Sequence, residues 1–364
     1  KPTPDFKVTH SYRFDETFDI VKAEVKAVQT SVGLCEVNGF NRYEITGADA
    51  QDFLDRMVCG RLNRKAGRVG LTYLLNDHGM VKAEATIANL PASDRGPERI
   101  WYGSAAAAES HDMDWLMKNL SADEDVQIKP LTNDQTILVL AGPKARAVLS
   151  AVSREDWSAK GFSWLSVREC FVGIAPATVL GVSFSGELAY EIHIPNASLY
   201  AAYLALREAG KEHGLTLFGA LAVDSMRLEK GYLHWKADLL TEFDPFETGL
   251  DRFVKMDKPD FVGKAALVKR QEEGLRHILV TLTLESDFAA AHGGASVMVG
   301  DKVVGTVTSG GWGHRLDLNL AYVFIDPGLS AIGTALEVDV LGHRISAVVS
   351  EMGAYDPTMA LVRG

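Results

Sequence analysis

The segment over residues 74–90, LLNDHGMVKAEATIANL, places one carboxylate inside a run of apolar residues. A turn at residues 77–79 joins two strand-like runs, and Glu84 lies in the second, between Ala83 and Ala85. If that strand lines a pocket, partial desolvation raises the pKa of the carboxyl group. It is then suited to proton transfer or to pairing with a cation. The alternative is that Glu84 faces water on an edge strand.

A second carboxylate follows a glycine turn in residues 182–195, VSFSGELAYEIHIP. Phe184 lies in this turn, and Tyr190 and Glu191 come after it. A carboxylate can accept two adjacent N–H groups, such as those of a pterin, while an aromatic side chain stacks on the ring. Glu191 together with Phe184 or Tyr190 could supply both contacts. An ordinary hairpin with exposed acidic side chains is the alternative.

Residues 219–267 begin with a predicted helix that places Asp224 and Arg227 one turn apart on the same face. The irregular segment after the helix is rich in aromatic and charged residues, including Tyr232 and Trp235. A long ordered loop of this composition usually carries function. For Asp224 and Arg227 the alternative is an ion pair on the helix surface, worth only ~0.5 kcal/mol.

Three glycines surround Trp312 in residues 308–323, TSGGWGHRLDLNLAYV, and Arg315 follows them. Glycine lets the backbone turn sharply, so this segment can present an aromatic ring and a cation. A cation at Arg315 could bind the carboxylates of an acidic ligand, such as the glutamate tail of a folate, within an otherwise acidic chain. A hairpin loop with a half-buried tryptophan is the alternative.

The elements that must position these residues follow from two apolar patterns. Residues 15–30 carry apolar side chains at helical spacing, which predicts an amphipathic helix near the start. Gly47 and Gly142 each end a strand-like run and are followed by an alanine at +3 and a leucine at +7, the spacing of one helix face. The repeat predicts a duplicated α+β unit, although a chance recurrence of a common strand–turn–helix is the alternative.

The pattern changes from about residue 276 onward. Short runs alternate apolar and polar residues around turns at residues 300–301 and 341–343. This pattern is typical of antiparallel hairpins that close into a small barrel or sandwich. The sequence therefore predicts an α+β fold, with a body over residues 1–270 and a β-barrel domain over residues 271–364.

The composition is that of an ordinary globular protein and argues against several functions. The chain has 364 residues, a formal net charge of −11 and no cluster of Lys and Arg, which argues against nucleic-acid binding. We find no apolar run that could span a membrane and no secretory signal, and three scattered cysteines are typical of reduced thiols, so we expect a cytoplasmic protein. No metal-ligand spacing and no dinucleotide-binding fingerprint occur, so we expect no metal and any flavin would lie outside this chain.

Taken in order, these segments resemble the folate-binding aminomethyltransferase family of the glycine-cleavage T-protein. Within that family they are most similar to the folate-binding C-terminal halves of dimethylglycine and sarcosine dehydrogenases. The resemblance runs from about residue 15 to the end and rests on the motifs YEITGADAQDFLDR, LLNDHGMVKAEATI, SFSGELAYEIHIP, DSMRLEKGYLHW, KPDFVGKAAL and VTSGGWGHR. It implies a three-domain cloverleaf, in which a duplicated ferredoxin-like body surrounds a central folate channel and an antiparallel barrel follows.

The resemblance also implies roles for individual residues. Glu84 matches the family's catalytic carboxylate, where the T-protein itself favours aspartate, and Arg227 matches the arginine of the R-L-E-x-G motif. Glu191 matches the pterin-binding glutamate, and Phe184 stands where the family often has tyrosine, which keeps ring stacking but loses a hydroxyl. The candidate catalytic residues are thus Glu84 and Arg227, and those expected to contact tetrahydrofolate are Tyr73, Val81, Phe184, Tyr190, Glu191, Tyr232, Trp235, Trp312 and Arg315.

These assignments predict a tetrahydrofolate-dependent transferase or demethylase that moves a methyl or methylene unit from a small methylated substrate to tetrahydrofolate. One alternative is the folate-binding half, or subunit, of a flavin-dependent demethylating oxidase. Another is a non-catalytic folate-binding protein. Relatives with that role carry a K-G-C-x-x-G-Q signature near Lys230-Gly231-Tyr232, and the tyrosine in place of cysteine argues against it.

Overall fold

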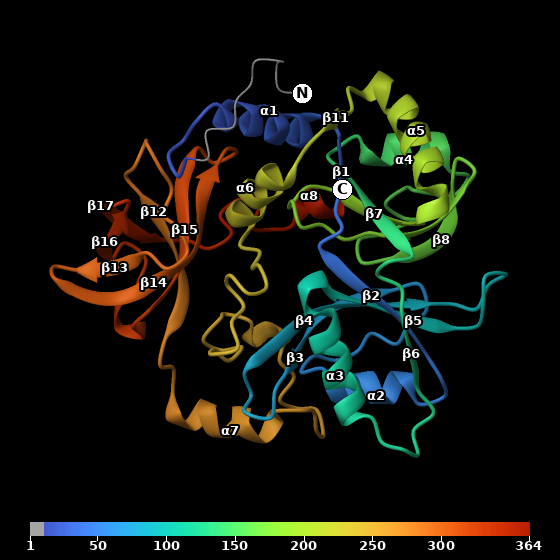
Figure 1. Cartoon of the computed structure of the whole chain (residues 1–364), viewed down its shortest axis with the longest axis horizontal. Helices are drawn as coiled ribbons and strands as arrows, with labels where there is room; N and C mark the ends of the chain where they lie inside the picture. Colours follow the sequence, from blue (N-terminus) through green and yellow to red (C-terminus); the bar gives the residue numbers. More distant parts are fainter. Residues whose placement is uncertain (1–10) are drawn as a thin grey trace.

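The structure is a computed structural model that describes residues 11–364. Two lobes that each contain a sheet and helices lie on one side of the molecule, and a β-barrel lies on the other (Figure 1). Helix α6 (Ala220–Lys230) and the irregular segment over residues 231–260 lie between them. The predicted combination of an α+β body and a C-terminal barrel is therefore confirmed.

The first lobe is a five-stranded antiparallel sheet covered on one face by two helices. Ala83, Ala85 and Ile87 alternate along one strand and pack against these helices, so the intervening Glu84 lies on the opposite face. The strands, in sheet order, are β3 (Val69–Leu75), β4 (Val81–Leu90), β5 (Arg99–Ala105), β2 (Phe40–Thr46) and β6 (Gln127–Pro130), and the helices are α2 (Ala50–Met57) and α3 (Glu109–Asn119).

The second lobe repeats this topology. Its sheet order matches that of the first lobe, with one further strand, β1, between β7 and β11. Apolar residues of the sheet pack under the two helices, as in the first lobe. The strands, in sheet order, are β8 (Val167–Val172), β9 (Ala175–Leu180), β10 (Ala189–Pro195), β7 (Gln135–Ala141), β1 (Gly33–Glu36) and β11 (Thr216–Leu217), and the helices are α4 (Ala145–Val152) and α5 (Leu199–Gly210).

The two glycines that suggested the repeat occupy equivalent places. Gly47 follows β2 and precedes α2, and Gly142 follows β7 and precedes α4. Their φ angles are 117° and 122°, a region that side chains rarely adopt. A Cβ atom would also come within 2.0 Å of the Asp125 carbonyl oxygen at Gly47 and within 2.5 Å of the Val28 carbonyl oxygen at Gly142. Both turns therefore require glycine, and the predicted duplication is confirmed.

The barrel is closed by six antiparallel strands, as the alternating pattern predicted. Its interior is filled by aliphatic side chains from all six strands. In order around the barrel the strands are β12 (Ile278–Leu284), β15 (Leu318–Ile325), β14 (Lys302–Gly313), β13 (Ser296–Val299), β16 (Ala335–Val340) and β17 (His343–Ser350).

The last segment of the chain leaves the barrel and returns to the body. The backbone N–H of Tyr355 donates to the Glu229 carbonyl in α6, and Arg146 in α4 donates to the Arg363 carbonyl of the short helix α8 (Ala360–Arg363) at 3.2 Å. The predicted 271–364 domain therefore contains a segment, residues 351–364, that packs on the lobes.

Two helices and an apolar cluster connect these parts. The predicted N-terminal helix is α1 (Thr17–Thr30), whose buried valines pack with Ala222 and Met226 of α6. Helix α7 (Lys264–Glu273) lies just before the barrel. A central apolar cluster contains Tyr73 of the first lobe, Leu228 of α6 and Phe324 of the barrel. Helix α6 therefore packs against both the first lobe and the barrel.

Candidate active site

Glu84 and Tyr73 face each other across β4 and β3. They are register partners, and the Tyr73 hydroxyl donates to Glu84 Oε1 at 3.3 Å. Burial raises the pKa of Glu84 to about 7, although the hydrogen bond from Tyr73 acts to lower it. A carboxyl group that titrates near neutral pH can both hold and release a proton under physiological conditions. The raised pKa is the shift that the sequence analysis expected if the Glu84 strand lines a partly desolvated surface.

Phe253 completes the surroundings of this pair. Its ring meets Tyr73 edge-on, with centroids 5.2 Å apart. The Tyr73 side chain is therefore fixed by an aromatic contact on its ring and by Glu84 at its hydroxyl. Burial, followed by the negative charge of Glu84, holds the pKa of Tyr73 well above its usual value, so it remains a hydrogen-bond donor.

Glu191 lies on β10, on the face that the second sheet turns toward the first. Its neighbour on that face, His193, contacts Trp101 of β5 edge-on, with ring centroids 5.2 Å apart. Ala88, which shares the face of Glu84 on β4, also packs between the sheets. Both carboxylates therefore lie on the facing surfaces of the two sheets. Within residues 11–364 Glu191 Oε1 forms no hydrogen bond, so it is free to accept one from a ligand.

Phe184 and Tyr232 come together although they are 48 residues apart in the sequence (232 minus 184). Their rings are nearly parallel, with an interplanar angle of 14° and centroids 6.0 Å apart. Tyr232 follows Gly231, whose φ of 75° ends α6 and turns the chain. Both rings are half-buried, so each keeps surface for contact with a flat ligand.

Val81 and Trp235 connect the strand of Glu84 to the segment after α6. The Val81 backbone N–H donates to the Phe243 carbonyl at 3.0 Å, and Trp235 Nε1 donates to the Lys82 carbonyl at 3.1 Å. Val81 is buried in the central apolar cluster, whereas Trp235 remains half-buried. The irregular segment is thus bonded directly to the start of β4.

Arg227 anchors this segment to α6 and to the barrel. It donates to Asp224 at 2.6 Å, to Asp238 at 2.6 Å and to Ser309 of β14 at 3.0 Å. Burial acts to lower the pKa of Arg227, but Asp224 and Asp238 more than offset it and the pKa is raised. Each of its nitrogens is bonded within the chain, so we assign it to positioning rather than to the catalytic role predicted for it.

Tyr190 cannot stack on a ligand at Glu191, and this prediction is wrong. Its side chain is 1% exposed and lies in the core of the second lobe, against Trp157 and Phe162. Successive residues of a strand point to opposite faces of the sheet. Tyr190 and Glu191 are adjacent on β10, so they cannot contact the same ligand.

Arg315 is not a free cation for an acidic tail, and this prediction is also wrong. Its side chain is 0% exposed and forms ion pairs with Glu229 at 2.5 Å and with Glu187 at 2.8 Å. The neighbouring Trp312 remains half-buried, as the alternative interpretation had it. Its ring packs edge-on against Phe14 and Phe18 near the N-terminus rather than beside Glu84 or Glu191.

Two residues of the site were missed in the sequence. Phe253 lies in the irregular part of residues 219–267, between two of the motifs, and has no distinguishing pattern of its own. His193 could have been found, because it lies two positions after Glu191 in a strand and therefore shares its face. Among the described residues no group of three or more His, Cys, Asp or Glu side chains could hold a metal ion.

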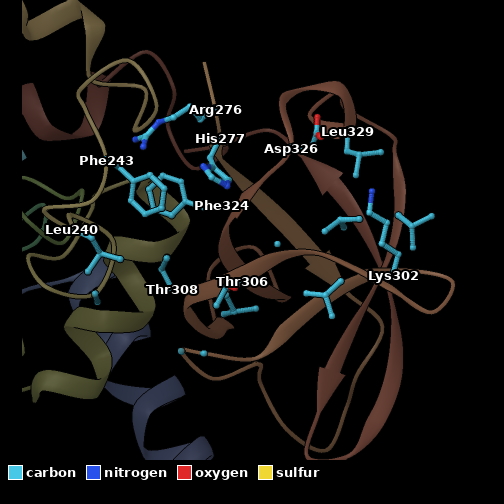
Figure 2. Close-up of a pocket in the computed structure, with 18 of the residues that line it drawn as sticks. Leu240, Phe243, Arg276, His277, Lys302, Thr306, Thr308, Phe324, Asp326 and Leu329 are labelled. Atoms are coloured by element: carbon cyan, nitrogen blue, oxygen red, sulfur yellow. The ribbon is translucent and has the colours of Figure 1, made fainter. Parts of the chain in front are cut away.

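A separate cleft lies between residues 236–243 and the barrel (Figure 2). It has a volume of about 1070 Å³, and Phe243 and Phe324 stack within it at 3.6 Å between ring centroids. Neither Glu84 nor Glu191 lines it. The cleft therefore does not coincide with the carboxylates, and we do not assign it to the chemistry.

Comparison with known proteins defines the class. The GCVT N-terminal domain matches residues 2–258, and the glycine cleavage T-protein C-terminal barrel domain matches residues 278–356. The chain belongs to this family, whose aminomethyltransferases use tetrahydrofolate as a cosubstrate. The resemblance identified in the sequence is confirmed.

Individual members of the family show similarity over almost the whole chain. It is 33% identical to mitochondrial dimethylglycine dehydrogenase from Homo sapiens over 96% of this chain and 40% of that protein. It is 28% identical to an aminomethyltransferase from Thermoanaerobacter sp. (strain X514) over 93% of this chain and 90% of that protein. The chain thus spans about two fifths of the dehydrogenase it matches.

A solved structure supports the fold. The glycine cleavage system aminomethyltransferase T from Bartonella henselae superposes with a TM-score of 0.81 at 21% identity, covering 93% of this chain and 90% of that one. Among the described residues no helix is long and apolar enough to cross a membrane.

Proposed function

We propose that the chain binds tetrahydrofolate between its two lobes and transfers a one-carbon unit to it from a small methylated substrate. The observation that carries this proposal is the half-buried Glu84, whose pKa of about 7 is set by desolvation and by Tyr73. Glu191, with a free carboxylate oxygen, is the complementary group for the amino and N–H edge of a pteridine. The parallel rings of Phe184 and Tyr232 would supply aromatic surface for a flat ligand.

Tetrahydrofolate would supply the amine nitrogens that receive the carbon. The chain's own contribution is positioning and electrostatics. Ionised Glu84 would stabilise a positively charged methylene donor such as an iminium, and would take up a proton as the carbon is transferred. Tyr73 would keep the Glu84 carboxylate in one orientation, and Glu191 would fix the heterocycle relative to it.

Calorimetry and turnover of Glu84→Gln test this proposal. We expect the wild-type chain to bind tetrahydrofolate, and the variant to bind it with a dissociation constant within about twofold of wild type. Turnover should fall by about 10²- to 10⁴-fold, the usual contribution of a positioned acid or base. The assay follows methyl- and methylene-folate by mass spectrometry with a panel of methylated donors, including a secondary amine with formaldehyde. The uncatalysed reaction is subtracted.

Two results would reject the proposal. If the wild-type chain shows neither heat nor a complex with tetrahydrofolate, the binding function is wrong. If Glu84→Gln and Glu84→Ala keep the full rate, the role of Glu84 is wrong although folate binding stands. Glu191→Ala is the complementary variant, because it should weaken binding while Glu84→Gln should not.

We further propose that the chain acts with a flavin-dependent oxidising domain or subunit that makes the reactive donor. The support is that the chain spans only 40% of the similar dimethylglycine dehydrogenase, and that it is also 29% identical to human sarcosine dehydrogenase. Demethylation of an amine would then be completed by capture of the carbon on this chain. The reading frame around the coding sequence, and copurification of a flavoprotein with the native chain, test this partner.

A further inference from the structure

His193 lies immediately beside the Glu191 carboxylate. The two residues share one face of β10, and His193 Nε2 is 3.3 Å from Glu191 Oε2. The imidazole is 3% exposed, and Trp101 from the first lobe meets it edge-on at an angle of 90°. The ring therefore packs between the two sheets, and its side chain has little freedom to rotate.

The surroundings select one protonation state of His193. Burial lowers its pKa, although Glu191 acts to raise it, and its Nδ1 is buried without a hydrogen-bond partner. An imidazolium would leave a charged N–H unpaired, whereas a neutral ring protonated on Nε2 leaves only an unpaired acceptor. The positive charge of Arg42 also acts against the imidazolium. These surroundings favour a neutral His193 ring that donates from Nε2 to Glu191.

Arg42 carries a positive charge that acts on this carboxylate. Its side chain is 1% exposed and donates to the Gln135 carbonyl at 2.9 Å. Burial lowers the pKa of Arg42, and the charge of Glu191 opposes this. Arg42 therefore supplies a fixed positive potential, while His193 supplies the direct hydrogen bond. Together they leave Glu191 Oε1 as the oxygen without a partner among residues 11–364.

We propose that His193 is a positioning residue that holds one oxygen of Glu191 so that the carboxylate presents its other oxygen to the amino and N–H edge of a pteridine. This inference rests on the proposed function. A carboxylate whose second oxygen is already hydrogen-bonded loses less conformational entropy when a ligand binds. The affinity for the ligand therefore increases without any further contact to it. His193 would therefore set affinity and discrimination for the 2-amino edge of the heterocycle while never touching it.

Two substitutions separate positioning from packing. His193→Phe keeps an aromatic ring against Trp101 but removes the donor, and His193→Gln keeps an N–H donor of similar reach. By calorimetry we expect His193→Phe to weaken tetrahydrofolate binding about tenfold, equivalent to about 1.4 kcal/mol. His193→Gln should stay within about threefold of wild type. An analogue that lacks the 2-amino group should lose less affinity in His193→Phe than in wild type.

A double-mutant cycle with Glu191→Gln supplies the second measurement. If His193 acts through Glu191, His193→Phe should have less than about a twofold effect in the Glu191→Gln background. Nitrogen NMR of the ligand-free wild-type chain should show a neutral imidazole protonated on Nε2, and this remains measurable if a variant fails to fold.

The outcomes distinguish the inference from the function on which it rests. A wild-type chain that does not bind tetrahydrofolate overturns the proposed function. Binding that is weakened by Glu191→Gln but unchanged by His193→Phe overturns the positioning role alone. Equal losses in the Phe and Gln variants, additive effects in the cycle, or a proton on Nδ1 would each overturn it as well.

Discussion

At the scale of single residues, the Glu84 carboxyl group sets the expected pH dependence. Its pKa is about 7, and the ionised form is the one that stabilises a cationic donor. We expect kcat/KM to rise through about pH 7 and then level off. Tyr73 donates to Glu84 and acts to lower that pKa, so Tyr73→Phe should raise it and move the rising limb to higher pH. Rate profiles of both proteins from about pH 6 to about pH 8.5 measure this. If the rising limb of kcat/KM lies at the same pH in Tyr73→Phe as in wild type, Tyr73 does not lower the pKa of Glu84.

The same group makes a prediction for stability. Because the folded-state pKa of Glu84 lies above the ordinary value of 4.5 for a glutamate side chain, the folded chain binds its proton more tightly than the unfolded chain. The free energy of unfolding therefore falls as pH rises through the window from about 4.5 to about 7. Glu84→Gln removes this dependence, so its Tm should rise relative to wild type at about pH 8 and less at about pH 5. A pH-independent difference would contradict the raised pKa.

The residue pattern left a solvent-exposed alternative open for both Glu84 and Glu191, and the family resemblance selected them as site residues. The sequence could not predict the environment of Arg315. Tyr190 was mispredicted although the alternation of a strand, which is visible in the sequence, places Tyr190 and Glu191 on opposite faces of the sheet. Arg315 was mispredicted because its buried partners, Glu187 and Glu229, come from segments 128 and 86 residues away (315 minus 187 and 315 minus 229).

At the scale of elements, Asp238 holds the irregular segment after α6 in place. Its side chain is 0% exposed and accepts from Arg227 at 2.6 Å, from the His234 backbone at 2.9 Å and from Thr308 at 2.6 Å. Asp238→Ala should destabilise the fold by about 3–5 kcal/mol, because it leaves Arg227 buried with a lost partner. Hydrogen exchange should increase over residues 231–250, and urea unfolding gives the free energy.

Asp224→Ala is the matched control for Asp238→Ala. Asp224 also pairs with Arg227, but its side chain is 49% exposed. Its loss should cost about 1 kcal/mol or less, as for other exposed pairs. Equal losses in the two variants would show that Asp238 is not the anchor. Sequence analysis identified Asp224 and Arg227 as neighbours on one helix, but the buried partner lies in a loop whose path no local pattern specifies.

Elements with a local signal were predicted well. The helix α1 and the two strand–glycine–helix units follow from apolar spacing and from glycines that must adopt positive φ. The barrel follows from alternation and turn residues. The path of residues 231–260 does not follow from such signals, because it is set by contacts with β4, α6 and the barrel together.

At the scale of the whole molecule, Arg315 connects the barrel to both the central helix and the second lobe. It extends from the turn after β14 to Glu229 of α6 and to Glu187, and its guanidinium lies 3.7 Å from the ring centroid of Tyr355 in the C-terminal segment. Arg315→Met keeps much of the side-chain volume but leaves two buried carboxylates unpaired. We therefore expect a loss of about 3–5 kcal/mol in urea unfolding.

The pH dependence of that loss distinguishes a buried charge from lost packing. Burial raises the pKa of Glu229, and Arg315 acts to lower it. Without the guanidinium the pKa of Glu229 rises further, so in Arg315→Met this group takes up a proton as pH falls and the penalty shrinks. The loss of stability relative to wild type should be larger at about pH 8 than at about pH 5.

Arg344→Met is the control. Arg344 pairs with Asp301 on the barrel surface, so its substitution should cost about 1 kcal/mol or less. If both arginine variants lose the same stability, or if the deficit of Arg315→Met does not change with pH, the barrel is not joined to α6 and the second lobe through these ion pairs.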